Sequence, residues 1–234
     1  MQSSTELLES QAVGTVDDFE LESLESLGAG SAVAVFRAAD NSLVAEVNPP
    51  VSAAALAELV ATARSRGIGA IWARGSAPSD DGVGFEQRRG YARLQAISPL
   101  TEIDAARPPL ALVPELQIAC FSGIWGHHRP ALETDPDTIF VGLHEARGWV
   151  GICEVDLERS QIDSPGLLPR FRTSDRYARL VREASSLLAP GLVTLETWGD
   201  TESTLAAYHE LGFELVEYVP GWELVVSHDG VDAR

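Results

Sequence analysis

The sequence predicts an α/β protein made of two similar units in tandem, and three observations support this prediction. Segments patterned as strands alternate with segments of helical periodicity along the chain. The order of these segments in the first half recurs in the second half, which indicates an internal duplication. Residues 97–114 carry four prolines and no regular periodicity, as expected of a junction. The predicted domains are residues 1–100 and 110–234.

The first half begins with two Val- and Ala-rich stretches that a polar turn joins into a hairpin. Apolar residues at helical spacing follow the double proline, and Gly67 is expected to end that helix. The expected elements are, in order, strands 31–40 and 41–48, a helix at 51–67, a strand at 68–75 and, in 85–97, a glycine-ended helix followed by a strand.

The second half repeats this order with additions at its start. The expected elements are a helix at 113–125, hairpin strands 138–145 and 148–158, a strand at 160–169, a helix from residue 172, a strand at 192–198, a helix at 201–212 and strands 213–219 and 222–226. Pro49 and Gly90 correspond to Pro169 and Gly212, with separations of 41 and 43 residues. These near-equal separations support the duplication.

Charge limits the partners of this chain. It has 35 acidic and 17 basic residues and a formal net charge of -18. Such a charge repels nucleic acids and anionic lipid surfaces but attracts cations. We therefore expect no nucleic acid and no membrane partner, and a small cationic ligand is favoured. The oligomeric state is left open.

Cys120 and Cys153 are the only cysteines, and both lie among apolar neighbours. Two buried free thiols are favoured over a disulfide or a metal site. The first residues lack a basic segment followed by an apolar one, and no run reaches the roughly 18 apolar residues of a membrane helix. These observations predict a cytoplasmic protein without a metal.

Two pieces of the second half carry a resemblance to a known family. They are "GLLPRFRTSDRYARLV", residues 166–181, and "TESTLAAYHELGFELVEY", residues 201–218. A strand, a proline, an arginine and a helix, followed by helix-Tyr-x-x-x-Gly-Phe-strand, resemble the GNAT superfamily of N-acetyltransferases. The resemblance covers residues 112–225 and, more faintly, 31–96. It implies two GNAT-like domains, each a mixed central sheet flanked by helices, with a shortened, non-catalytic first copy, a layout similar to that of mycothiol synthase.

The resemblance implies that acetyl-CoA or another acyl-CoA is the co-substrate. Its pyrophosphate would lie at the helix that follows Pro169, because unpaired N–H groups at a helix start bind phosphate. The residues expected to bind it are Gly166, Leu167, Leu168, Arg172, Thr173, Ser174, Arg176 and Tyr177. Two glycine positions of the family motif hold Asp175 and Tyr177, and a carboxylate repels phosphate. Arginines between 170 and 182 either bind phosphate or coat an exposed helix face.

The resemblance also suggests catalytic groups for acyl transfer to an amine. Tyr208 holds the family's position for the acid that protonates the leaving thiolate, and its counterpart in the first half is Glu86. The strand position that is often glutamate in relatives is Gln161, and an amide cannot accept a proton. Asp163, on the same strand face, is therefore the expected base, followed by Glu154.

The acceptor side is expected in "WGHHRP", residues 125–130. There Trp125 could wall the pocket and His127 and His128 could contact the acceptor, although a polar loop without function also explains the histidines. Asp200 and Thr201 are expected to cap the last helix. The predicted function is transfer of an acyl group from acyl-CoA to the amine of a small acceptor. A non-catalytic metabolite-binding or scaffold protein, or other chemistry on the same fold, remains open.

Overall fold

The computed structural model describes residues 33–38, 42–47, 49–78, 84–97, 104–127 and 139–226. Their strands are β1 (Val33–Arg37), β2 (Leu43–Val47), β3 (Ala70–Arg74), β4 (Glu86–Ile97), β5 (Ile139–Glu145), β6 (Gly148–Asp156), β7 (Gln161–Leu167), β8 (Leu192–Trp198) and β9 (Glu214–Val225). Their helices are α2 (Ala53–Ser65), α3 (Val113–Phe121), α4 (Ser174–Ser185) and α5 (Glu202–Glu210), with short 3-10 turns η2 (Leu110–Leu112) and η3 (Pro169–Phe171).

One mixed sheet contains the strands of both halves, in the order β1-β2-β3-β9-β4-β8-β7-β6-β5. In each half an antiparallel pair leads into a parallel pair that a helix connects. In the first half β1 and β2 are antiparallel, and α2 joins β2 to the parallel β3. In the second half β6 and β7 are antiparallel, and α4 joins β7 to the parallel β8. The repeated order of elements predicted from the sequence therefore recurs in the strand pairing.

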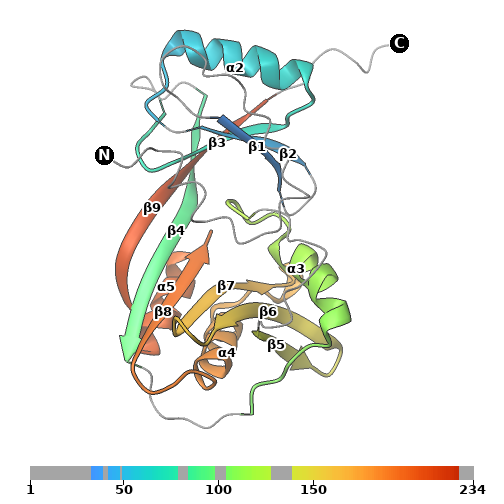
Figure 1. Cartoon of the computed structure of the whole chain (residues 1–234), viewed down its shortest axis with the longest axis vertical. Coiled ribbons are helices and arrows are strands. Elements are labelled where there is room, and N and C mark those ends of the chain that lie inside the picture. Colours follow the sequence, from blue (N-terminus) through green and yellow to red (C-terminus); the bar gives the residue numbers. More distant parts are fainter. Residues whose placement is uncertain are drawn as a thin grey trace.

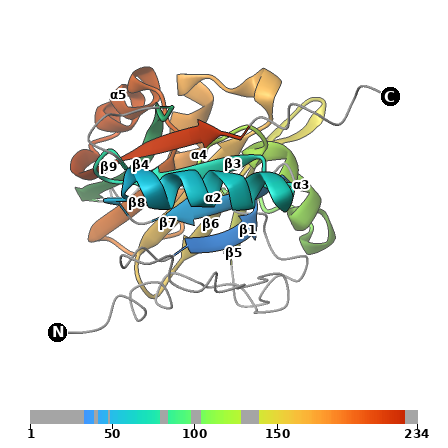
Figure 2. The same cartoon turned by 90° about the horizontal axis from the view of Figure 1, so that it is seen from above.

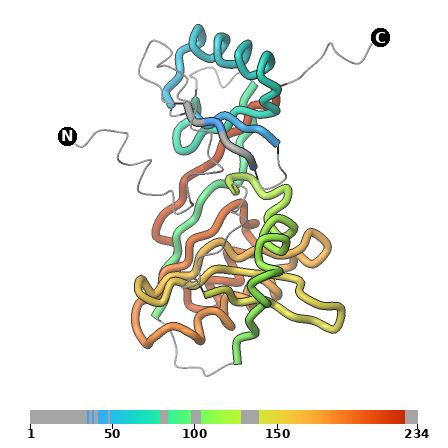
Figure 3. Tube along the Cα trace, turned by 45° about the vertical axis from the view of Figure 1, so that its right-hand side comes forward, coloured from blue at the N-terminus to red at the C-terminus, as the bar shows by residue number. Residues whose placement is uncertain are grey.

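The two halves do not build a sheet each. β4, from the first half, lies between β8 and β9, and β9 in turn lies between β4 and β3. In Figure 1 these two long strands run from the part that contains α2 into the part that contains α4 and α5. Figure 3 shows the traces of β4 and β9 side by side along this path. The coarse expectation of an α/β fold with a mixed sheet flanked by helices is correct, whereas the predicted separation into two tandem domains remains a prediction.

Helices cover both faces of the sheet. α2 packs on β2 and β3 through Leu59 and Ala63, and Figure 2 shows it lying over this part of the sheet. α4 and α5 pack on the same face further along, where Leu180, Val181 and Tyr208 join the largest core cluster. α3 packs on the opposite face, against β6 and β7. Residues of β7 and β8 therefore point alternately toward α4 and α5 or toward the α3 face.

The helix expected at the start of residues 85–97 is wrong. Residues 86–97 form a single strand, in which Ala92, Leu94 and Ala96 are buried at every second position. Gly90 does not end a helix; a Cβ there would lie 1.9 Å from the carbonyl oxygen of Val219 on β9. The close approach of the two strands explains this glycine. Glu86, on this strand, consequently has no helical position that corresponds to Tyr208.

The two strands expected at 213–219 and 222–226 form one strand, β9. Pro220 lies inside it, opposite a register shift between Arg88 and Tyr91 of β4. A proline has no N–H to donate and is tolerated in strands at such irregularities. The carbonyl of Pro220 accepts a hydrogen bond from the N–H of Gly75, so the long strand continues into its pairing with β3.

Other sequence expectations agree with the structure. The helices at 51–67, 113–125 and 201–212 and the hairpin across Ala146 and Arg147 are present, with shorter bounds. Cys120 and Cys153 are buried free thiols. The polar turn expected at residues 40–42 lies mostly outside the described residues. In the described part of the chain, no helix is long and apolar enough to cross a membrane.

Candidate functional site

The central feature of the candidate site is a separation of two parallel strands. β7 pairs with β8 only from Gln161 to Asp163, opposite Thr194 to Glu196. Beyond this point β7 bulges at Ser164, whose φ is 47°, and stays paired with β6, whereas β8 stays paired with β4. Backbone groups of β7 on the β8 side therefore have no strand partner over Gly166 and Leu167. The Leu167 carbonyl on this edge accepts a hydrogen bond from Arg172, so an extended ligand that paired here would compete with that bond.

The end of β7 is fixed by close packing against α3. A Cβ on Gly166 would lie 2.3 Å from the ring of Phe121, so only glycine fits here without a shift. The Arg172 guanidinium donates hydrogen bonds to the carbonyls of Leu167, Cys120 and Ser122, at 3.1, 3.0 and 2.6 Å. Arg172 was expected to bind the co-substrate, but these bonds commit it to joining β7, α3 and the start of α4. Binding of the co-substrate by Arg172 remains a prediction.

The start of α4 leaves its first N–H groups without a side-chain cap. Thr173, the N-cap residue, is extended and exposed and makes no side-chain capping bond. The capping residues of α2 and α5, Ser52 and Thr201, both accept such a bond. Asp175, in the first turn of α4, is exposed and so adds negative charge near this helix end. The α4 end can receive an anion through Thr173 and Ser174, but Asp175 weakens it.

Two other residues expected at the co-substrate are occupied within the protein. Arg176 forms a two-point ion pair with Glu145 of β5, with contacts of 2.7 and 3.3 Å, and its guanidinium lies 5.2 Å from the ring of Phe171. The hydrogen bond from Arg176 lowers the pKa of the Glu145 carboxyl. Tyr177 is buried in the core between α4 and the sheet. The Tyr177 side chain therefore fills the interior, and its predicted contact with the co-substrate remains a prediction.

Tyr208, the predicted acid, lies on α5 and is fully buried against the sheet. Its hydroxyl is close enough to Asp200 and Thr197 to interact with both, but it makes no hydrogen bond of good geometry. Burial raises the pKa of Tyr208 well above its ordinary value, and the nearby Asp200 adds to this effect. The hydroxyl is thus protonated and available as a donor at neutral pH.

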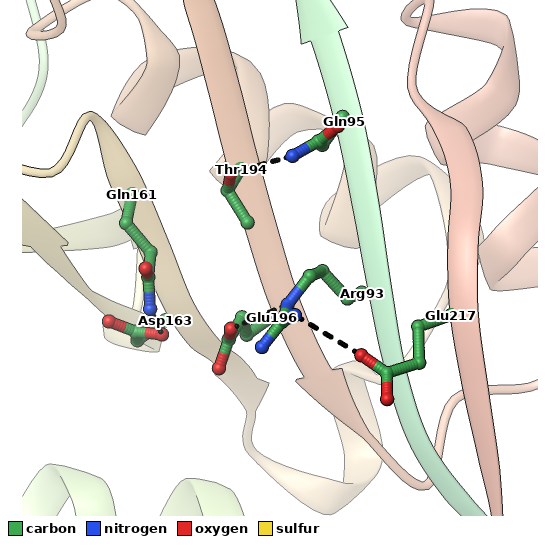
Figure 4. A network of polar contacts seen from close by, with 7 residues as sticks. All are labelled: Arg93, Gln95, Gln161, Asp163, Thr194, Glu196 and Glu217. Atoms are coloured by element: carbon green, nitrogen blue, oxygen red, sulfur yellow. Dashed lines mark hydrogen bonds and ion pairs between the residues drawn. The ribbon is translucent and has the colours of Figure 1, made fainter. Parts of the chain in front are cut away.

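Asp163, the predicted base, lies on the other face of the sheet. Its neighbour Ile162 points into the core beneath α4, so Asp163 points to the α3 side, where it accepts a 2.7 Å hydrogen bond from the amide of Gln161. Figure 4 shows Asp163 beside Glu196, which is bound by Arg93. Burial raises the pKa of Asp163 to about 6, and Glu196 contributes to the rise.

Glu154 pairs with Asp163 across β6 and β7, so both candidate bases lie on one face. The predicted acid lies on the opposite face. The structure therefore does not bring Tyr208 and Asp163 to one point on either face, and the two could meet only across the separation between β7 and β8.

The residues expected at the acceptor lie where the chain leaves α3. Trp125 is buried between Trp72 of β3 and Trp198 of β8. The centroid of its ring lies 5.2 Å from that of Trp72 and 6.2 Å from that of Trp198. His127 is buried and stacks on Phe121 at 4.3 Å. His127 is thus part of the packing, in contrast to the polar loop expected from the sequence. His128 lies outside the described residues.

Asp200 and Thr197 interact in a way that the sequence does not predict. Asp200 was expected to cap α5, but the side chain of Thr201 accepts the bond from the N–H of Thr204 instead. Asp200 turns inward, and Thr197 at the end of β8 donates a short hydrogen bond to it. Burial raises the pKa of Asp200 to about 7. Asp200 and Thr201 are adjacent, and both residue types are common N-caps. Because one of them is enough to cap α5, the second can serve another purpose, and this is the sequence signal for Asp200.

In comparisons with known proteins, no family model matches the sequence, and no curated protein matches it significantly. Solved structures share the fold: a candidate acetyltransferase from Pyrococcus horikoshii has a TM-score of 0.51 at 14% identity, covering 86% of this chain and 72% of that chain. A GCN5-related N-acetyltransferase from Sphaerobacter thermophilus has a TM-score of 0.50 at 12% identity, covering 87% and 78%.

A conserved protein of unknown function from Staphylococcus epidermidis has a TM-score of 0.50 at 10% identity, covering 90% of this chain and 97% of that chain. At such identities the similarity shows the fold alone. The chain therefore shares the fold of these solved acetyltransferases. Within the described residues no group of three His, Cys, Asp or Glu side chains could hold a metal ion.

Proposed function

We propose that this protein transfers an acetyl or other acyl group from acyl-CoA to an amine of a small acceptor. The observation that carries the proposal is the separation of β7 from β8 directly before the uncapped start of α4, in a fold shared with N-acetyltransferases. The edge of β7 over Gly166 and Leu167 has no strand partner on the β8 side, and an amide-containing arm would compete there with Arg172 for the Leu167 carbonyl; the N–H groups at Thr173 and Ser174 suit a phosphate. Residues 110–234 supply these groups.

The first half takes a supporting part in this proposal. It is a shortened copy without a tyrosine on a helix, and it contributes β4 to the sheet beside β8. We infer that this copy is non-catalytic. The net charge of -18 favours a cationic acceptor, such as an amine that is protonated in solution.

The residues present fit an acyl-CoA in part. The edge of β7 and the start of α4 are suitable, but Arg172 and Arg176 are engaged in bonds within the protein and Asp175 opposes a phosphate. Asp175 and the full burial of Tyr208 favour a second candidate function, a GNAT-like protein that binds a metabolite without catalysis. The two functions differ in whether acyl-CoA is consumed.

Calorimetric titration with acetyl-CoA and longer acyl-CoAs tests the proposal, followed by detection of free thiol when a panel of small amines is added. We expect saturable binding and amine-dependent thiol release. Binding without release supports the non-catalytic alternative, and absence of binding rejects both acyl-CoA functions.

Asp175 provides a matched pair of variants for the same titration. Two unit charges about 4 Å apart interact by roughly 4 kcal/mol at an effective dielectric near 20, and exposure to solvent reduces this. Asp175→Asn removes the repulsion and should tighten acetyl-CoA binding by about 3- to 10-fold. Asp175→Glu keeps the charge and should leave the affinity nearly unchanged. Equal affinities in all three proteins would place the phosphate elsewhere.

A further inference from the structure

The half-buried carboxyl group of Asp200 interacts with the candidate acid Tyr208. Asp200 follows β8, and the hydroxyl of Thr197, which is only 1% exposed, donates a short hydrogen bond to Asp200 Oδ2. Because Thr201 caps α5, Asp200 has no capping task. A half-buried carboxyl group without an ion pair among the described residues is costly to ionise, and such groups gather at functional sites.

The groups that face Asp200 come from three elements. They are Tyr208 of α5, Tyr177 of α4 and Arg89 of β4. Arg89 is exposed, so its charge is screened by solvent. The Tyr208 hydroxyl is fully buried and lacks a well-formed hydrogen bond, although it interacts with the carboxyl. Asp200 is therefore an acceptor available to the Tyr208 hydroxyl.

The protonation state of this carboxyl group is open at neutral pH. Burial raises the pKa of Asp200 to about 7, while the hydrogen bonds from Thr197 and Tyr208 act in the opposite direction. Both the protonated and the ionised form are therefore populated where an enzyme works, which is the condition for passing a proton in both directions.

We propose that Asp200 is a positioning residue that orients the Tyr208 hydroxyl and replaces its proton, with Thr197 fixing the carboxyl group. This inference rests on the proposed acyl transfer. As the amine nitrogen bonds to the acyl carbon, the carbon–sulfur bond breaks and its electron pair stays on sulfur. The Tyr208 proton passes to sulfur, and the Asp200 carboxyl proton passes to the tyrosine oxygen. The proton lost by the amine nitrogen returns through solvent to Asp200, so protons balance over one turnover.

Carbon-13 NMR of aspartate carboxyl groups tests this inference without any ligand. The Asp200 signal is assigned as the one absent from Asp200→Asn. In the wild-type protein we expect it to titrate near pH 7, far above the ordinary aspartate value of about 4. In Tyr208→Phe its midpoint should rise further, by about 0.5 to 1 pH unit, because a hydrogen bond to the ionised form is lost. Thr197→Val should have the same effect, and Thr197→Ser, which keeps the hydroxyl, should not.

The inference is overturned if Asp200 titrates near pH 4, or if Tyr208→Phe leaves its midpoint unchanged. The first criterion needs only the wild-type protein, so it stands even where a variant fails to fold. If acyl-CoA is consumed, Asp200→Asn should lower kcat and remove the limb of its pH profile near 7, while KM stays within about 2-fold. Absence of acyl-CoA binding by the wild type rejects the proposed function, whereas an uncoupled titration in a protein that binds acyl-CoA rejects the Asp200 role alone.

Discussion

Replacing Asp200 with asparagine should stabilise the folded protein, and increasingly so as pH rises. Burial raises the pKa of this carboxyl from 3.8 to about 7 on folding. Between these values the unfolded chain has lost the proton while the folded chain keeps it, so the folded state binds more protons. Stability then falls as pH increases. The loss of stability caused by ionising Asp200 is absent below about pH 4 and complete above about pH 7.

The size of this effect follows from the pKa difference. A shift of about 3 units corresponds to roughly 4 kcal/mol, since one unit corresponds to about 1.4 kcal/mol. Asparagine has no charge to bury, so its contribution does not change with pH. The difference in unfolding free energy between Asp200→Asn and the wild type should therefore rise by up to roughly 4 kcal/mol between pH 4 and pH 8. Other titrating groups are common to both proteins and cancel from this difference.

Urea unfolding at intervals from pH 4 to pH 8.5 measures this difference. Asp163→Asn is a matched control, because burial raises the pKa of Asp163 only to about 6. Its difference from the wild type should stop rising near pH 6, while that of Asp200→Asn continues to about pH 7. A difference for Asp200→Asn that stays constant with pH, or that falls as pH rises, would refute the reasoning.

Three further predictions concern the anchors of the site. Arg172→Ala should lower the free energy of unfolding by about 3 kcal/mol or more, because three carbonyls lose a charged donor. Arg176→Ala, which breaks an ion pair screened by solvent, should lower it much less; denaturant unfolding compares the two variants, and equal losses would contradict the anchoring role. Tyr208→Phe should keep the free energy of unfolding within about 1 kcal/mol, because at most one net hydrogen bond is lost, but should reduce turnover by about 100- to 10,000-fold in a thiol-release assay. Normal turnover would make Tyr208 a packing residue. Residues 104–234 alone lack β4 and should not unfold in a cooperative thermal transition. Adding residues 33–103 as a separate chain should restore that transition. A cooperative transition of residues 104–234 without the added chain would show an independent domain.

The sequence predicts most elements of this fold because their patterns are local. The apolar stripe of α4 and the apolar runs within β5 and β6 depend on neighbours a few residues away. The exchange of β4 and β9 between the halves is not local. Gly90 has the same sequence surroundings as a helix-ending glycine, and only the backbone of β9 opposite it explains its presence.

The candidate site was predicted in part, and the limits have a physical basis. Tyr208 and the strand-to-helix passage after Gly166 follow from a motif, so their places could be inferred. The faces to which Asp163 and Tyr208 point depend on how β7 and α5 pack, and residue spacing alone does not fix this. Arginines present a further ambiguity, because a guanidinium that binds carbonyls, as Arg172 does, has the same sequence signature as one that binds phosphate.

Hydrogen exchange at the start of α4 tests the central claim most directly. Addition of acetyl-CoA should slow exchange of the amides of residues 164–176, where β7 separates from β8 and α4 begins. Residues 49–57 around the start of α2 are the internal control, since they hold the corresponding place in the first half and Ser52 caps that helix. Protection confined to 164–176 is the predicted result. No protection at saturating acetyl-CoA, or protection of 49–57 instead, would contradict the account.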